Sequence, residues 1–197
     1  MAIDPITTSM LTPLLSTVAK SIAEGLKLKT GALTEKIKIN LEIGFGNYVS
    51  QQIQRYSHVK TIISGNTPVK LEDVYVNLYL SSGNKKYRDD DFINENRSHK
   101  NFVFCATAGA GKSMLMRYLY FSFLKEDSVK LPVFFELREL NDNKDKSLFD
   151  ILHSKISEYI ENFTEKQMRY ALEKGIICLF LDGYDEIDHD NQKKRSR

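Results

Sequence analysis

Apolar residues near the start of the chain recur at helical spacing. The recurring positions are Leu14, Leu15, Val18, Ile22 and Leu26. Together with Pro13, which is tolerated in a first helical turn, they predict a short amphipathic helix that ends near Gly25 or Gly31. Because its polar face carries little basic charge, we expect this helix to pack on its own chain rather than on a membrane or a partner.

The next segment fits two patterns. Alternating apolar residues at 37–45 indicate a strand, whereas a stripe at helical spacing over 37–56 indicates a helix. Gly44 and Gly46 weaken both interpretations. The polar residues in the second half suit a helix better, so we predict a helix over 35–58.

Residues 66–100 contain one strand-like run and a long polar stretch. β-Branched and aromatic residues alternate over 74–80, which predicts a strand. Residues 81–100 are polar and charged, and they include the acidic run Asp89, Asp90 and Asp91. We expect a solvated loop here rather than a metal cluster, because no ligand of another type stands beside the acids.

From residue 101 onwards the pattern alternates between strand and helix. The predicted elements are a strand at 101–106, a helix at 111–125, a strand at 131–137, a helix after a capping box at Ser147, a helix after a capping box at Thr164 that ends at Gly175, and a strand at 176–181. The last run is continuously apolar, as in strands that are buried on both faces of a parallel sheet. Strands alternating with helices predict an α/β fold.

Composition narrows the class of protein. The 197 residues are 42% hydrophobic and 27% charged, as in a water-soluble globular protein, and the formal charge of +2 gives no signal for nucleic acid. The basic cluster at 193–197 is expected to be solvated.

Cys105 and Cys178 lie in apolar runs and are expected to be buried thiols in a reducing compartment. The sequence contains no transmembrane run and no charged secretory leader, so we expect a cytoplasmic protein. The four histidines show no metal spacing.

The strongest chemical signal is the glycine-rich segment 106–113, Ala-Thr-Ala-Gly-Ala-Gly-Lys-Ser. It lies between a predicted strand and a predicted helix, which is the context of a phosphate-binding loop. Backbone N–H groups and the helix N-terminus attract phosphate, Lys112 can reach the β- and γ-phosphates, and Ser113 can hold Mg²⁺. The expected nucleotide-binding residues are Ala108, Gly109, Ala110, Gly111, Lys112, Ser113 and Met114. Ala106 stands where the usual pattern has glycine.

A second signal follows the buried strand at 176–181, where the chain reads Asp-Gly-Tyr-Asp-Glu. The carboxyl edge of a parallel sheet is where such folds place ligand chemistry. Asp182 is the expected Mg²⁺ ligand, Glu186 the expected general base, and Asp185 an alternative base or a helper. A GTPase would need Gly at the position of Asp185 and a guanine-binding Asn/Thr-Lys-x-Asp motif, which is missing from the sequence.

The two motifs together resemble those of NACHT-domain NTPases of the signal-transduction (STAND) class. Residues 131–140 resemble the strand that follows the first helix in that family, and residues 45–80 resemble, less specifically, the region before the domain in bacterial antiphage NACHT (NLR-like) proteins. The likeness covers about residues 35–190. It implies ATP or ADP with Mg²⁺, and a switch in which nucleotide gates self-association after a trigger, for example a phage-derived one, is sensed.

On this basis we expect a partial P-loop NTPase parallel sheet with flanking helices. Residues 1–65 would form an N-terminal helical region, and residues 66–197 the N-terminal part of the NACHT domain. Family members continue past the second motif, and the next strand would lie between the strands of the two motifs, so we expect a truncated piece with weak hydrolysis or none. The alternative function is a non-catalytic regulator that associates with a full-length relative through its N-terminal helices.

Overall fold

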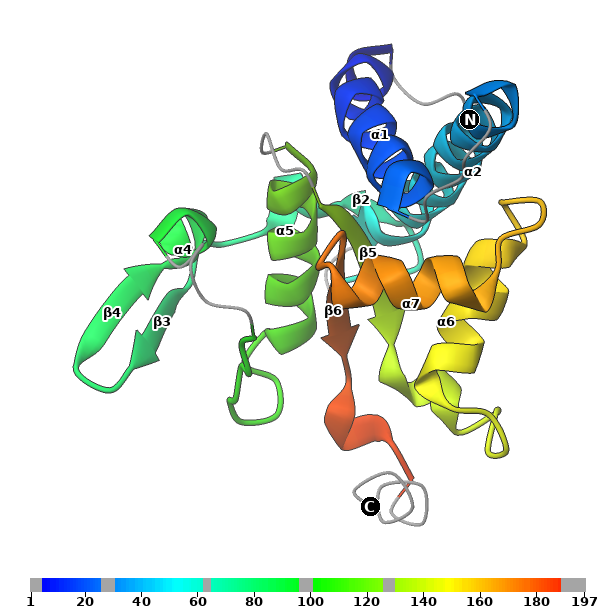
Figure 1. The fold of residues 1–197 in the computed structure, drawn as a ribbon. Coiled ribbons are helices and arrows are strands. Elements are labelled where there is room, and N and C mark those ends of the chain that lie inside the picture. Colours follow the sequence, from blue (N-terminus) through cyan, green and yellow to red (C-terminus); the bar gives the residue numbers. More distant parts are fainter. Residues whose placement is uncertain (1–4, 26–30, 62–64, 96–100, 126–129, 189–197) are drawn as a thin grey trace. The chain divides into compact units, whose positions relative to one another are not determined.

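The computed structural model describes residues 5–25, 31–61, 65–95, 101–125 and 130–188 (Figure 1). Two compact units make up the chain. The first unit combines Met1–Gln52 with Asp127–Arg197, and the second is Ile53–Glu126. The domain boundary predicted at residue 65 stays a prediction, and the basic cluster at 193–197 lies outside the described residues.

Two long helices begin the first unit. They are α1 (Pro5–Gly25) and α2 (Gly31–Tyr56). The first helix predicted from the apolar spacing is confirmed, but it is longer than expected: it begins at Pro5, so Pro13 lies in its interior and not in its first turn. The buried face of α1 contains Leu11, Leu14, Leu15, Val18, Ala19, Ile22 and Ala23. This face contacts a strand and a helix from the C-terminal part of the same unit, which confirms that α1 packs on its own chain.

The helical interpretation of residues 35–58 is confirmed, and Gly44 has a packing role within it. A Cβ on Gly44 would overlap Ile160 and lie 2.7 Å from the carbonyl oxygen of Tyr159. Two edge-to-face aromatic pairs flank this close approach, Phe45 with Phe163 at 5.8 Å and Tyr48 with Tyr159 at 5.7 Å between ring centroids. Glycine weakens a helix in isolation. Here it allows the backbone of α2 to come close to a distant segment.

A parallel strand pair forms the sheet of the first unit. Strand β5 (Leu131–Glu136) pairs with β6 (Ile177–Asp182), in a register that sets Leu131 opposite Ile177 and Glu136 opposite Asp182. Two parallel strands with helices between them along the chain confirm the predicted α/β class. Every residue of β5 is buried, whereas β6 is only partly covered, and Leu181 is 36% exposed.

The helices between these strands begin at the two predicted capping boxes. They are α6 (Leu148–Ser157), capped by Ser147, and α7 (Glu165–Glu173), capped by Thr164. Each capping hydroxyl accepts a backbone N–H three residues later, and the side chain at that later position accepts the backbone N–H of the cap. Gly175 follows α7 with a φ of 64°, the left-handed conformation typical of a helix end.

The second unit contains small antiparallel pairs and the helix after the glycine-rich segment. Its elements are β1 (His58–Val59), β2 (Val69–Lys70), α3 (Leu71–Val74), β3 (Tyr79–Ser82), β4 (Lys85–Arg88), α4 (Asp89–Glu95) and α5 (Lys112–Lys125). Strand β1 pairs with β2, and β3 pairs with β4 as a hairpin.

Three predictions of secondary structure are wrong in this unit. The predicted strand at 74–80 is irregular over 75–78: its first residue ends α3, and only its last two residues enter β3. The predicted loop at 81–100 contains the hairpin and α4, and its first acid, Asp89, is buried. Residues 101–106 form no strand. Their aromatic side chains pack on α4 instead, where Phe92 meets Phe102 at 4.9 Å and Phe104 at 5.2 Å.

Candidate functional site

The glycine-rich segment lies in the second unit as an exposed turn that leads directly into α5. Ala110 N donates a hydrogen bond to Thr107 O at 3.3 Å, which closes the turn. Gly109 and Gly111 have φ values of 77° and 87°, which side-chain-bearing residues adopt only at a cost. A Cβ on Gly109 would meet no atom within 4 Å, so the backbone borders open space there.

The expected phosphate-binding residues fall at the start of α5. Residues 108–110 are exposed in the turn, Gly111 precedes the helix, and Lys112, Ser113 and Met114 lie in its first turn. This turn of α5 contains no acidic residue. No carboxylate in this turn therefore offsets the partial positive charge of its N–H groups and of the helix dipole, which favours binding of an anion.

The side chain of Lys112 bends over the turn that precedes it. Its Nζ donates hydrogen bonds to the carbonyl oxygens of Ala106, at 3.1 Å, and Thr107, at 3.4 Å. The ammonium is thus held against the carbonyl oxygens at the start of the glycine-rich turn. A phosphate bound at this turn would replace the two neutral carbonyl oxygens as hydrogen-bond acceptors of Lys112. Because phosphate oxygens are charged, the hydrogen bonds of Lys112 would become stronger.

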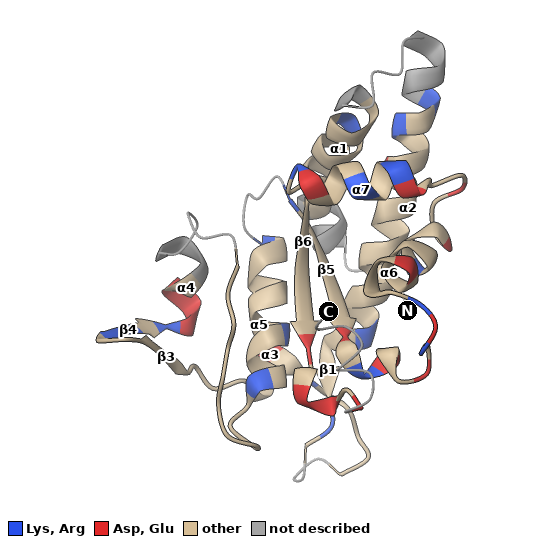
Figure 2. Ribbon diagram, turned by 60° about the horizontal axis from the view of Figure 1, so that its bottom comes forward, with Lys and Arg blue, Asp and Glu red and all other residues tan. Residues whose placement is uncertain are grey.

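The acidic motif lies in the first unit, at the carboxyl end of the parallel strands. Because Glu136 and Asp182 are partners in the strand register, both carboxylates reach the same edge, and both are buried. In Figure 2 the ribbon is red, the colour of Asp and Glu, where the arrows of β5 and β6 end. Asp182 therefore occupies the position at which an open α/β sheet binds ligands.

The chain then turns sharply through Gly183. This residue has a φ of 78° and precedes the short helix η2 (Tyr184–Glu186). A Cβ on Gly183 would lie 3.2 Å from Cδ of Glu186, so the Glu186 side chain folds back over the glycine. Asp185 and Glu186 are both exposed. The turn thus carries the expected base back toward the strand end that bears Asp182.

Arg138 joins the ends of the two strands and was not among the predicted site residues. It lies in the short helix η1 (Leu137–Leu140) after β5, donates two hydrogen bonds to buried Glu136, and lies 3.9 Å from Oε2 of Glu186. The hydrogen bonds to Glu136 and its negative charge raise the pKa of Arg138 above its ordinary value. The guanidinium is therefore a permanent cation beside the expected base.

Asn141 fixes the backbone of the acidic turn. Its Nδ2 donates to the carbonyl oxygen of Glu186 at 2.9 Å, and its Oδ1 accepts from the backbone N–H of Asp188 at 2.9 Å. The rule that ligand chemistry gathers at carboxyl ends of strands could have selected Arg138 and Asn141, because both follow β5 closely.

Residues 103–197 match the NACHT domain family. A NACHT domain is a nucleotide-binding NTPase module, so the match implies such a module in this segment, which we call the NACHT segment. It includes the whole glycine-rich turn and the acidic motif and spans slightly less than half of the chain. The resemblance of the upstream residues, 35–102, stays a prediction. No curated protein and no solved structure matches the chain.

Two other observations concern ligands and membranes. Among the described residues, no three His, Cys, Asp or Glu side chains cluster as they would around a metal ion. None of the described helices is both long enough and apolar enough to cross a membrane.

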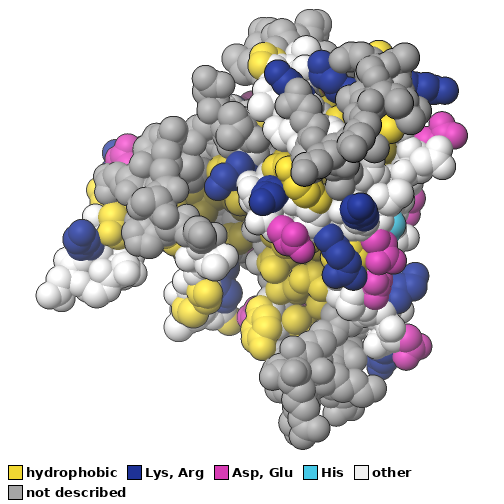
Figure 3. Space-filling model, in the orientation of Figure 1, with side chains coloured by type: hydrophobic (Ala, Val, Ile, Leu, Met, Phe, Trp, Pro, Cys, Tyr) yellow, Lys and Arg dark blue, Asp and Glu magenta, His cyan; other side chains and the backbone are white. Residues whose placement is uncertain are grey.

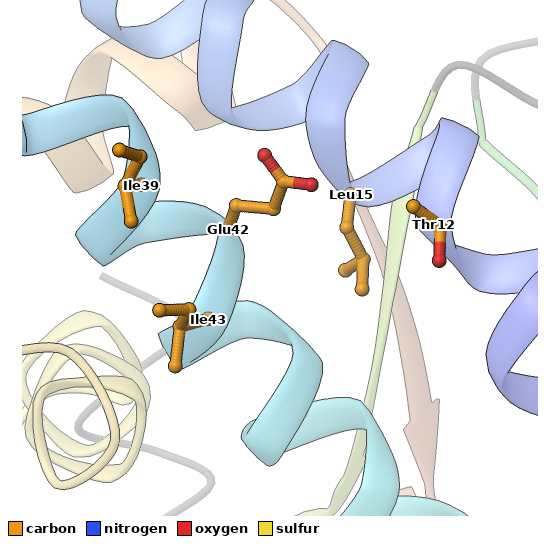
Figure 4. Close-up of a pocket in the computed structure, with 5 residues that line it drawn as sticks. All are labelled: Thr12, Leu15, Ile39, Glu42 and Ile43. Atoms are coloured by element: carbon orange, nitrogen blue, oxygen red, sulfur yellow. The ribbon is translucent and has the colours of Figure 1, made fainter. Parts of the chain in front are cut away.

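A hollow between α1 and α2 is distinct from both motifs. It is lined by Thr12, Leu15, Ile39, Glu42 and Ile43 (Figure 4). Ile39 and Ile43 are 54% and 59% exposed. With one carboxylate and an apolar wall, this hollow resembles a protein contact surface more than a nucleotide site.

Proposed function

We propose that the protein is an ATP- and ADP-binding signalling module whose nucleotide state gates self-association. The observation that carries the proposal is the exposed turn at 106–113, which combines two left-handed glycines with Lys112 at the start of α5. Its match to the NACHT family supports an NTPase module rather than another phosphate-binding turn.

In the proposed chemistry, each part of the NACHT segment has a separate task. The N–H groups of residues 108–114 and the ammonium of Lys112 bind the phosphates. The Ser113 hydroxyl and Asp182 hold Mg²⁺, which neutralises phosphate charge when bound. Glu186, assisted by Asp185, orients and deprotonates the attacking water if the chain hydrolyses ATP.

The proposed setting is bacterial antiphage defence in the cytoplasm, with a phage-derived trigger. This setting rests on the resemblance of the upstream residues to bacterial NACHT proteins. The expected partner is a second copy of the chain or a longer relative.

Binding of labelled ATP by the whole chain tests the central claim. We expect Lys112→Ala to weaken binding by about tenfold or more, since hydrogen bonds to charged groups are each worth about 1.5–3 kcal/mol. Lys125→Ala is the matched control, because Lys125 lies exposed in the last turn of the same helix. Equal binding by both variants would contradict the proposal.

Two further measurements test the switch and the chemistry. Light scattering with ATP, with ADP and without nucleotide should show a change of mass that Lys112→Ala lacks. Glu186→Gln should bind ATP normally and abolish any hydrolysis that the wild type shows.

A phage-plating assay with the Lys112→Ala variant tests the defence setting, and undiminished protection by that variant would count against it.

A second function is favoured by the exposed isoleucines of α2. In this alternative the N-terminal helices bind a partner, and nucleotide is not required. Deleting residues 1–30 would remove the buried face of α1, so substitution of the exposed Ile43 by Asn is the sharper test. Activity that survives Lys112→Ala and is lost in Ile43→Asn would favour this alternative.

A further inference from the structure

The second unit contains a buried carboxylate for which the nucleotide chemistry has no direct use. Asp89 is 1% exposed, although it belongs to an acidic run whose other members are more accessible. Burying a carboxylate is costly unless hydrogen bonds replace its water. The groups that replace this water all come from the irregular segment at 75–78.

Three donors converge on Asp89. The Tyr75 hydroxyl and the backbone N–H of Leu78 (at 2.6 Å) donate to Oδ2, and Nδ2 of Asn77 donates to Oδ1 at 2.9 Å. In return, the backbone N–H of Asp89 donates to the carbonyl oxygen of Leu78 at 3.1 Å. Burial, followed by the bond to Asp89, raises the pKa of Tyr75 well above its ordinary value, so the phenol stays a donor.

The segment fixed in this way touches the phosphate-binding turn and its helix. The ring of Tyr75 stacks on Tyr118 of α5, with centroids 4.1 Å apart and planes at 7°. A Cβ on Gly111 would lie 3.8 Å from Cδ1 of Leu78, so the leucine packs beside the glycine that precedes Lys112.

The helix that Asp89 begins contacts the residues that lead into the turn. Phe92, one helical turn after Asp89 and buried like it, packs on Phe102 and Phe104, which lead into the glycine-rich segment. The residues before the turn, in the turn and after it are therefore all in contact with groups that are fixed by Asp89 or lie in its helix.

We propose that Asp89 is a positioning residue that holds the phosphate-binding turn in its binding conformation through Tyr75, Leu78 and Phe92. The turn needs such support because residues 101–106 form no strand, and a loop with two left-handed glycines has many competing conformations. The effect of Asp89 on ATP affinity rests on the proposed nucleotide-binding function, whereas its effect on the conformation of the turn does not.

Hydrogen exchange of the nucleotide-free whole chain tests the proposal, with Asp89→Asn compared with wild type. Asparagine keeps the size of the side chain, but it loses the charge and one acceptor oxygen. We expect amides of residues 107–115 to exchange about tenfold faster, as the loss of one charge-assisted hydrogen bond would give. Amides of β5 and β6, in the other unit, should exchange as in wild type. Asp91→Asn is the matched control, because Asp91 is exposed in the same acidic run.

Tyr75→Phe provides a second variant in case Asp89→Asn does not fold. It keeps the ring that stacks on Tyr118 and removes only the hydroxyl, and we expect a smaller acceleration confined to the same residues. Unchanged exchange in the turn of a folded variant would overturn the proposal. A uniform acceleration across both units would also overturn it, because it would show general destabilisation.

ATP affinity then separates this proposal from the proposed function. If wild type binds ATP, we expect Asp89→Asn to weaken binding about fivefold to tenfold and Asp91→Asn to leave it unchanged. Unaltered affinity in folded Asp89→Asn would overturn the positioning role. If wild type binds no ATP, the proposed function fails, while the exchange measurement still decides whether Asp89 holds the turn.

Discussion

Arg138 donates two hydrogen bonds to a single oxygen of Glu136, from Nε at 3.1 Å and from Nη2 at 2.6 Å. The Glu136 side chain is 8% exposed, whereas that of Arg138 is 58% exposed. The pair therefore serves mainly to neutralise a carboxylate that the sheet buries at its carboxyl edge.

Substitution of Arg138 by Ala should destabilise the protein because it removes the cation that donates two hydrogen bonds to buried Glu136. We expect a loss of about 1–3 kcal/mol in the free energy of unfolding, measured by urea denaturation. Arg138→Lys should recover only part of this, since lysine cannot reproduce the two bonds of the guanidinium. Lys144→Ala is the control, because the Lys144–Asp188 pair is exposed and long, at 4.0 Å, and should change stability little.

Gly44→Ala should destabilise the first unit, although alanine is the better helix former. The added methyl group would overlap Ile160 and approach the Tyr159 carbonyl, and overpacking of this kind costs about 1–3 kcal/mol. In Gly46→Ala the new Cβ would lie 3.4 Å from Cδ1 of Leu15, so the gain in helix propensity should offset the contact. Thermal unfolding of both variants checks this prediction. Equal unfolding midpoints for the two variants would contradict the close approach of α2 to residues 159–160.

The two capping boxes should respond differently to acid. The Ser147 hydroxyl and its backbone N–H donate to Asp150, which lowers the pKa of Asp150 below its ordinary value of 3.8. A lowered folded pKa gives stability that is present above the unfolded pKa and is lost as pH falls through the folded one. The box on α6 should therefore weaken below about pH 4.

The box on α7 provides the control because its partner, Gln167, does not titrate. The difference in unfolding free energy between wild type and Asp150→Asn should be present at pH 7 and should close below about pH 4. The corresponding difference for Gln167→Ala should stay constant. A pH-independent difference at Asp150 would contradict the assigned hydrogen bonds.

The two cysteines should differ in reactivity, contrary to the expectation that both are buried. Cys105 is exposed immediately before the glycine-rich segment, whereas Cys178 lies within β6, where burial raises the pKa of its thiol. Since the thiolate is the reactive form, iodoacetamide should modify Cys105 rapidly and Cys178 only after unfolding. Mass spectrometry of wild type and Cys105→Ser checks this, and fast labelling of Cys105→Ser would contradict it. Slower labelling of Cys105 with ATP present would further support the nucleotide site.

Local patterns predicted the elements whose conformation depends on near neighbours. The helical stripes of α1 and α2, both capping boxes and the apolar runs of β5 and β6 were all confirmed, because each depends on residues within one or two turns of one another. The phosphate-binding turn could be recognised in the same way, since its glycines, lysine and serine are contiguous. The roles assigned to Asp182, Asp185 and Glu186 stay predictions.

The failures at 74–80 and at the acidic run share a physical cause. The alternation at 74–80 predicts a strand, but a strand needs a hydrogen-bonding partner, and the backbone N–H of Leu78 is bonded to the Asp89 side chain instead. The acidic run predicts a solvated loop, but its first member is buried by donors that come from more than ten residues upstream. Periodicity contains no information about such pairings.

The sequence by itself determined that this protein has an α/β part with a phosphate-binding turn and an acidic strand end, because backbone propensity and apolar spacing act locally. Only the tertiary structure decided which polar side chains support these motifs. Arg138 is bound to Glu136, Asn141 to the acidic turn, and Asp89 to the segment beside Gly111. The physical reason is that a buried charge is tolerated only where the fold brings donors to it, and those donors are set by packing rather than by order along the chain.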